Sequence, residues 1–129
     1  MKLPILFTAM ASTSGKITSA REPILTVRLA SDVTVQCVVD TGFTGALMLP
    51  REIIERSSVP IIGKQTFQLV SGRSIIASVA LVEIDWLGQQ QLVRAVISDG
   101  SDALIGAELL DGNRLVVDYI SDQVTLTTE

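Results

Sequence analysis

The stretch of sequence that decides the fold is Cys37-Val38-Val39-Asp40-Thr41-Gly42-Phe43-Thr44-Gly45. The chain passes here from an apolar run to a carboxylate and then to a turn. Residues 33–39 are rich in β-branched side chains and predict a strand, whereas Gly42 and Gly45 permit close backbone approaches that other residues resist. A carboxylate at the end of a buried strand is costly to desolvate unless a neighbouring group satisfies it. Asp40 is therefore the first candidate for a functional acid.

The composition narrows the possible chemistry, because the sequence contains no histidine and one cysteine. Without histidine there is no Ser-His or Cys-His nucleophile pair, and a zinc site would need carboxylates and a single thiol. We therefore expect no metal and no cofactor, with acid–base chemistry carried mainly by the fourteen Asp and Glu residues. Cys37 shares the strand parity of Val35 and Val39, which predicts a small buried apolar residue rather than a reactive thiol.

Charge and hydropathy give expectations about partners. The net charge is −4 with a sequence pI near 4.7, and the ten Lys and Arg residues are scattered, so we expect no nucleic-acid partner. No apolar run approaches the roughly 20 residues that cross a bilayer, so we expect no membrane partner. We expect a cytoplasmic protein; the alternative is secretion through a weak signal segment over residues 1–11.

The length of 129 residues and the 47% hydrophobic content predict one domain with one core. We expect an N-terminal strand or flexible leader over residues 1–20, with a loop or loose tail at 12–19, and a single domain over residues 21–129. Short helices are predicted at 51–56, after Pro50, and at 108–110. Alternation and turn residues predict strands over 24–29, 33–39, 46–49, 67–70, 75–87, 92–97, 103–106, 114–119 and 123–128.

Two of these strands carry further signals. The strands on either side of Ser71-Gly72-Arg73 predict a hairpin with these residues at its tip. Leu104 and Ile105 are followed at once by Gly106, which indicates a buried strand that another segment crosses closely, with no room for a Cβ atom at position 106.

Val38-Val39-Asp40-Thr41-Gly42, followed about sixty residues later by Ala103-Leu104-Ile105-Gly106, resembles the retropepsin-like aspartic proteases. These are the single-domain retroviral proteases and their cellular and bacterial relatives, and the resemblance covers residues 24–126. It implies an all-β fold, a closed retropepsin-like acid-protease barrel with one or two short helices. In that fold the strand at 104–106 passes close to the Asp40 turn, and the hairpin over residues 67–82 forms a flap over the cleft.

The resemblance implies an aspartic endopeptidase in which Asp40, Thr41 and Gly42 are the catalytic residues. Peptide hydrolysis without a metal or a nucleophile needs one carboxyl as base and one as acid, and two close carboxyls share a proton to supply both roles. The chain contains one Asp-Thr-Gly, so we expect a homodimer that contributes Asp40 from each subunit and acts on a peptide or protein substrate. Thr41 would hydrogen-bond across the two-fold axis; the alternative is a simple turn hydroxyl.

The resemblance also assigns substrate-binding positions. Phe43 and Thr44 would line the cleft, and Ser71, Gly72 and Arg73 would close over bound peptide unless they form an ordinary surface turn. Retropepsins usually carry a small residue at the position of Phe43. Three interpretations stay open. The ring of Phe43 narrows the cleft, or it alters the hydration of the aspartates, or it packs outward while Thr44 supplies the missing hydroxyl. The terminal segments 2–7 and 124–128 are candidates for a sheet that bridges the subunits.

Two other classes of function remain. The first is a retropepsin-like dimerisation or peptide-binding module with weak or no catalysis, which the bulky Phe43 favours. The second is an unrelated β-sandwich binding domain, in which Asp40 merely caps a turn.

Overall fold

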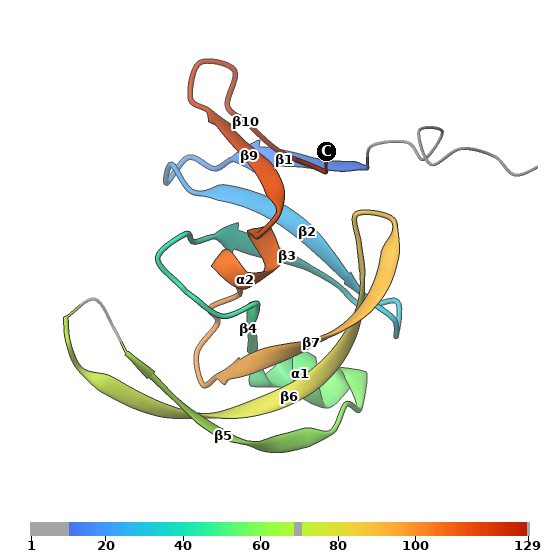
Figure 1. The fold of residues 1–129 in the computed structure, drawn as a ribbon, viewed down its shortest axis with the longest axis vertical. Coiled ribbons are helices and arrows are strands. Elements are labelled where there is room, and N and C mark those ends of the chain that lie inside the picture. Colours follow the sequence, from blue (N-terminus) through green and yellow to red (C-terminus); the bar gives the residue numbers. More distant parts are fainter. Residues whose placement is uncertain (1–10, 69–70, 129) are drawn as a thin grey trace, which may run out of the picture.

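The structure is a computed structural model that describes residues 11–68 and 71–128 (Figure 1). In these residues the chain forms ten strands and two short helices. The strands are β1 (Ser12–Ile17), β2 (Pro23–Leu29), β3 (Thr34–Val39), β4 (Leu47–Pro50), β5 (Ile61–Gln68), β6 (Ser74–Trp86), β7 (Gln89–Ser98), β8 (Leu104–Ile105), β9 (Asn113–Asp118) and β10 (Gln123–Thr128). The helices are α1 (Arg51–Ser57) and α2 (Ala107–Leu110). Neither helix is long and apolar enough to cross a membrane.

The described strands form one sheet in the order β5-β6-β7-β4-β8-β3-β2-β1-β10-β9. An additional pairing of β6 with β2, through Arg28↔Asp85 and Leu29↔Ile84, joins strands that are distant in this order. It closes β2, β3, β8, β4, β7 and β6 into a ring, from which β5 extends on one side and β1, β10 and β9 on the other (Figure 1). The predicted all-β fold with two short helices is confirmed, and the predicted closed barrel corresponds to this ring.

An apolar core is built by alternate residues of the ring strands. Its fully buried members include Leu25, Val27, Leu29, Cys37, Leu47, Leu49, Val82, Ile84 and Ile105. The prediction that Cys37 is a buried apolar residue is confirmed, and burial raises the pKa of its thiol to about 12. The indole N–H of buried Trp86 donates to the carbonyl oxygen of Leu109 over 3.3 Å, which ties α2 to the core.

The prediction of a loop or loose tail over residues 12–19 is wrong, because Ser12–Ile17 form strand β1. Ser12 to Lys16 pair with β10, and Lys16 and Ile17 pair with β2. A Cβ atom on Gly15 would lie 1.8 Å from the carbonyl oxygen of Ile24, so the glycine permits the close crossing of the two strands. Main-chain hydrogen bonds hold this strand, and its small polar side chains give no apolar alternation to reveal it.

Strand β5 is longer than the prediction, which placed a strand only over residues 67–70. Ile61 to Thr66 are exposed and Phe67 is half-buried, so the segment lacks the alternation that marks a strand in sequence. Its pairing with β6 runs from Ile61↔Ala80 to Gln68↔Ser74. Residues 69–70 of the predicted strand lie outside the described residues.

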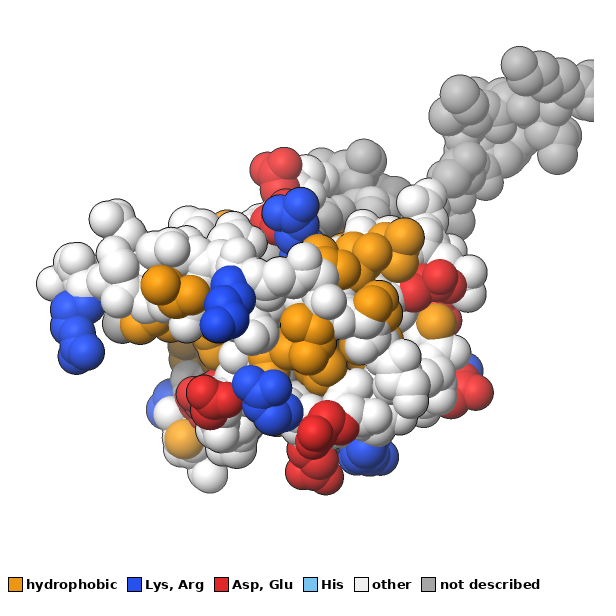
Figure 2. Space-filling view, turned by 90° about the horizontal axis from the view of Figure 1, so that it is seen from below, with side chains coloured by type: hydrophobic (Ala, Val, Ile, Leu, Met, Phe, Trp, Pro, Cys, Tyr) orange, Lys and Arg blue, Asp and Glu red, His pale blue; other side chains and the backbone are white. Residues whose placement is uncertain are grey.

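Large apolar side chains are exposed along β5, β6 and β7. They are Ile61, Ile62, Ile76 and Leu92. Figure 2 looks from below onto the side of the molecule that carries β5, β6 and α1, and shows hydrophobic side chains gathered among Lys, Arg, Asp and Glu. The hairpin expected to act as a flap therefore lies on a face of mixed apolar and charged character.

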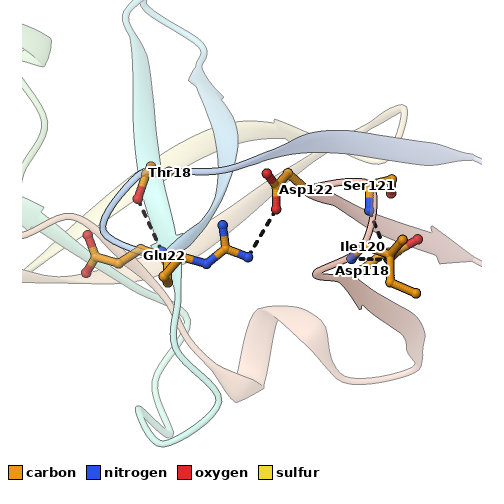
Figure 3. Close-up of polar contacts among 7 residues, drawn as sticks. Thr18, Glu22, Asp118, Ile120, Ser121 and Asp122 are labelled. Atoms are coloured by element: carbon orange, nitrogen blue, oxygen red, sulfur yellow. Dashed lines mark hydrogen bonds and ion pairs between the residues drawn. The ribbon is translucent and has the colours of Figure 1, made fainter.

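The β9–β10 turn is fastened to the β1–β2 turn by polar contacts (Figure 3). The guanidinium of Arg21 pairs with Asp122 at 3.0 Å and lies 5.2 Å from the ring centroid of Tyr119. The carboxylate of Asp118 accepts a 2.8 Å hydrogen bond from the main-chain N–H of Ile120, which lowers the pKa of that carboxyl. The Arg21 contacts thus join the two turns, whereas the Asp118 hydrogen bond orders the β9–β10 turn itself.

Strand β10 lies between β1 and β9, so both of its hydrogen-bonding edges are used within the chain. The predicted bridging segment 124–128 therefore offers no free strand edge to a second copy. Among the described strands, β9 and β5 are the outer members of the sheet. The other predicted bridging segment, residues 2–7, lies outside the described residues.

Candidate active site

Strand β8 inserts between β3 and β4 at the position of the Asp40 turn. It pairs in parallel with β3 through Val38↔Leu104 and Val39↔Ile105, and antiparallel with β4 through Leu47↔Ile105. Residues 40–46 therefore leave β3, pass around the end of β8 and enter β4 on its other side. The predicted passage of the strand at 104–106 close to the Asp40 turn is confirmed.

Gly106 is the residue that makes this crossing possible. A Cβ atom at this position would lie 2.1 Å from the carbonyl oxygen of Gly45, well inside any permitted contact. The main-chain N–H of Gly106 instead donates to the carbonyl oxygen of Ala46 over 2.9 Å, and the N–H of Ala107 donates to that of Phe43 over 2.7 Å. The prediction that position 106 has no room for a side chain is confirmed.

Asp40 is held by the backbone on three sides. Its main-chain N–H donates to the carbonyl oxygen of Ile105 over 2.9 Å, and its own carbonyl oxygen accepts from the N–H of Phe43 over 3.1 Å. The N–H of Gly42 donates to carboxylate oxygen Oδ1 of Asp40 over 2.9 Å. Within residues 11–68 and 71–128, the second carboxylate oxygen accepts no hydrogen bond, so a half-buried and oriented acid keeps one oxygen open to a ligand.

A cavity of about 180 Å³ opens beside this carboxylate. Its lining residues are Asp40, Gly42, Phe43, Thr44, Met48, Phe67, Gln68, Ile75 and Leu104. Four of the residues predicted for the site thus come together here: Asp40, Gly42, Phe43 and Thr44. Thr41, Ser71, Gly72 and Arg73 are exposed and do not line this cavity.

The ring of Phe43 turns back over the two glycines of the crossing. A Cβ atom on Gly45 would lie 2.7 Å from Cζ of this ring, and one on Gly106 would lie 2.6 Å from Cδ2. On its other side the ring faces Phe67 of β5, with centroids 6.3 Å apart and planes inclined by 50°. Of the three readings of Phe43, this geometry favours the one in which the ring narrows the cleft.

Five lining residues lie outside the predicted site set, and four of them are apolar. They are Met48, Phe67, Gln68, Ile75 and Leu104. Counting outward from Ser71 at the hairpin tip would have found two of them, because Phe67 and Ile75 are directly opposed in the β5–β6 ladder. Met48 and Leu104 are paired between β4 and β8, and no pattern in the sequence predicts the register of these two strands.

A larger groove of about 800 Å³ continues from the cavity, and the two share Met48, Ile75 and Leu104. Charged side chains also line it, among them Arg51, Lys64, Asp99 and Asp102. Arg51 pairs with Asp99 at 3.1 Å. A chain longer than one residue can therefore extend from Asp40 along an apolar floor with a charged border.

No group of three His, Cys, Asp or Glu side chains that could hold a metal ion occurs in the part of the chain that the structure describes. The chemistry offered by the site is that of one oriented carboxylate, the main-chain N–H groups of its turn, and an apolar cavity.

Comparisons with known proteins agree with this architecture. Neither the protein-family models nor the curated protein sequences contain a match to the chain. Among solved structures, a retropepsin-like aspartic protease from Rickettsia conorii superposes with a TM-score of 0.68 at 14% identity, covering 93% of each chain. The chain has the retropepsin-like fold.

Two viral structures share the retropepsin-like fold with this chain. EIAV protease in complex with the inhibitor HBY-793 gives a TM-score of 0.59 at 18% identity, covering 72% of this chain and 88% of that one. The foamy viral protease-reverse transcriptase in complex with an RNA/DNA hybrid gives 0.52 at 16% identity, covering 69% of this chain and 11% of that one. The family resemblance drawn from the Asp40 and Gly106 motifs is thus supported by the fold of these solved structures.

Proposed function

We propose that the protein is an aspartic endopeptidase that hydrolyses peptide bonds with a water molecule held between two Asp40 carboxyls, one from each subunit of a homodimer. The observation that carries the proposal is the placement of Asp40. It ends a core strand, is oriented by the N–H of Gly42, and faces a cavity and groove in a retropepsin-like fold.

The chemistry follows from two carboxyls that share one proton. The ionised Asp40 takes a proton from water, whose oxygen attacks the carbonyl carbon of the peptide bond. The protonated Asp40 donates to the carbonyl oxygen, which gives a tetrahedral diol. Proton transfer to the amide nitrogen then lets the carbon–nitrogen bond break, leaving a carboxylic acid and an amine. One chain supplies a single Asp40, so the proposal requires two copies.

Two observations support the need for a second copy. Asp40 is the one aspartate that lines the cavity among the described residues. Thr41 is exposed, and its hydroxyl has no hydrogen-bond partner within residues 11–68 and 71–128, which leaves it available to a second subunit. In the proposal, Gly42 presents its backbone to the substrate, Phe43 and Thr44 contact a substrate side chain, and Ser71, Gly72 and Arg73 close over the peptide.

The experiment compares three proteins on a denatured polypeptide at acid and at neutral pH. The wild type is expected to cleave it, and Asp40→Asn is expected to lose at least about a thousandfold in rate because base and acid are both removed from the pair. Asp85→Asn is the matched control, because Asp85 is an exposed aspartate of β6 that does not line the cavity. Cleavage that survives in Asp40→Asn would overturn the proposal.

A second candidate is a dimerisation or peptide-binding module with weak or no catalysis. The ring of Phe43, which narrows the cleft beside Asp40, favours it. Peptide binding by the wild type without cleavage at either pH would support this candidate over the endopeptidase.

A further inference from the structure

We infer that Phe43 determines the specificity of the cleft: its ring packs against that of Phe67 to form one wall of the cavity beside Asp40, and it limits the size of the apolar side chain that enters next to the scissile bond. The inference rests on the proposed function and names its substrate class. It concerns the position at which this chain carries an aromatic ring where the family usually has a small residue.

The first step is the fixed position of the Phe43 ring. Gly45 and Gly106 together form a flat seat for it, since a Cβ atom on either would lie within 2.7 Å of a ring carbon. The backbone of Phe43 is fastened too, because its carbonyl oxygen accepts from Ala107 over 2.7 Å and its N–H donates to the carbonyl of Asp40 over 3.1 Å. A half-buried ring so constrained is a wall, not a mobile surface group.

The second step is the contact between Phe43 and Phe67. Phe67 lies on β5 with its ring centroid 6.3 Å from that of Phe43, and it is paired across the hairpin with Ile75, which also lines the cavity. Aromatic rings at this spacing are in contact and attract each other. The pair therefore connects the Asp40 turn to the flap hairpin and forms a continuous aromatic wall on one side of the cavity.

The third step is the chemistry of the space that is left. Met48 and Leu104 complete an apolar lining, with Gln68 and Thr44 as polar neighbours. A charged substrate side chain entering it would lose hydration without gaining an opposite charge there other than Asp40, the residue that must react. An apolar side chain gains free energy by leaving water for this lining. The cavity thus selects apolar over cationic residues.

The fourth step is size. The cavity has a volume of about 180 Å³ and continues into the larger groove. The ring of Phe43 occupies the space over Gly45 and Gly106 and so limits the size of the apolar side chain that can enter. Removing the ring of Phe43 would open the cavity over Gly45 and Gly106 and admit a larger group.

The test uses peptides that differ only in the residues flanking the scissile bond, with Leu, Trp or Lys placed at each side in turn. We expect the wild type to cleave the Leu peptide with the highest kcat/KM. In Phe43→Ala, the ratio of kcat/KM for Trp over Leu should rise about tenfold or more, as expected for a change in pocket volume. Phe43→Leu should shift the ratio less. A uniform loss for all peptides, or an unchanged ratio in Phe43→Ala, would overturn the inference.

Gly45→Ala provides an independent control on the position of the ring. The three heavy atoms nearest to its new methyl group would all be ring carbons of Phe43, the closest at 2.7 Å, so it should displace the ring and lower cleavage of the Leu peptide. In the double variant Phe43→Ala, Gly45→Ala, the ring that the new methyl group would displace is absent. Its ratio of kcat/KM for the Trp peptide over the Leu peptide should therefore match that of Phe43→Ala alone. If the effects of the two substitutions on the free energy of activation simply added, the proposed contact of the Phe43 ring with Gly45 would be contradicted.

The same peptides are also bound to Asp40→Asn, so that failure of the inference is distinguishable from failure of the proposed function. One outcome is that no protein cleaves the peptides, while the Leu peptide still binds most tightly and Phe43→Ala tightens binding of the Trp peptide. This outcome would overturn the endopeptidase proposal and support the pocket. If cleavage depends on Asp40, but neither cleavage nor binding depends on Phe43, the endopeptidase proposal is supported and the inference about Phe43 is overturned.

Discussion

The main-chain N–H of Gly42 donates to Oδ1 of Asp40 over 2.9 Å, and a Cβ atom added to Gly42 would lie 3.3 Å from the same oxygen. The turn thus holds the carboxylate by a hydrogen bond and leaves too little space for a side chain at position 42. Orientation of Asp40 and the absence of a side chain at position 42 are two aspects of one arrangement.

Gly42→Ala is expected to lower activity more than stability. The backbone at Gly42 is outside the left-handed region, so alanine is conformationally allowed, but its methyl group must push the carboxylate by a few tenths of an ångström. Misplacement of a catalytic group commonly costs about tenfold to a hundredfold in rate. The measurement is kcat/KM beside the free energy of unfolding. Full activity in Gly42→Ala would show that the position of this carboxylate is not critical.

Gly106→Ala is expected to destabilise the fold by more than about 2 kcal/mol, because the new methyl group would meet the carbonyl of Gly45 at 2.1 Å and the backbone would have to separate. Urea unfolding followed by the fluorescence of Trp86, the single tryptophan, measures the loss. Gly100→Ala is the control, since its Cβ would make an ordinary 3.8 Å contact with Ser98. Equal stabilities of the two variants would mean that β8 does not cross the turn this closely.

Cys37 makes stability depend on pH in alkaline solution. Burial raises the pKa of its thiol to about 12, whereas an unfolded cysteine titrates near about 8.5. The thiol therefore favours the folded state fully below pH ~8.5, and this contribution declines as pH rises toward 12, by up to about 1.4 kcal/mol for each pH unit. Unfolding free energies between pH 8 and 10 should fall more steeply for the wild type than for Cys37→Ala. Parallel slopes would contradict burial of the thiol.

The parts of the fold that sequence could predict are those with side-chain alternation. Strand β3 and the short helix after Pro50 lie at their predicted positions within one or two residues, because apolar periodicity and a helix-starting proline are local signals. Strand β1 was missed because its residues are small and polar and its position depends on main-chain bonds to β10, more than a hundred residues away.

The candidate site divides in the same way. Asp40 and Gly42 lie two residues apart and could be predicted from one motif, and Gly106 could be predicted as a close crossing. The partner of the Phe43 ring could not, because Phe67 reaches it through the curvature of the β5–β6 hairpin, which no local pattern encodes. For the same reason the sequence left the orientation of Phe43 open, and the structure decides it through Gly45.

The measurement that tests the shared active site most directly is a mixing experiment. Wild-type protein is held at one concentration, above the level at which its specific activity stops rising, and folded Asp40→Asn is added after dissociation and reassociation of the subunits. Random pairing leaves about half of the wild-type activity with an equal amount of Asp40→Asn and about a tenth with a ninefold excess, because mixed dimers hold one functional carboxyl. Activity that stays constant as Asp40→Asn is added would show that each chain works alone.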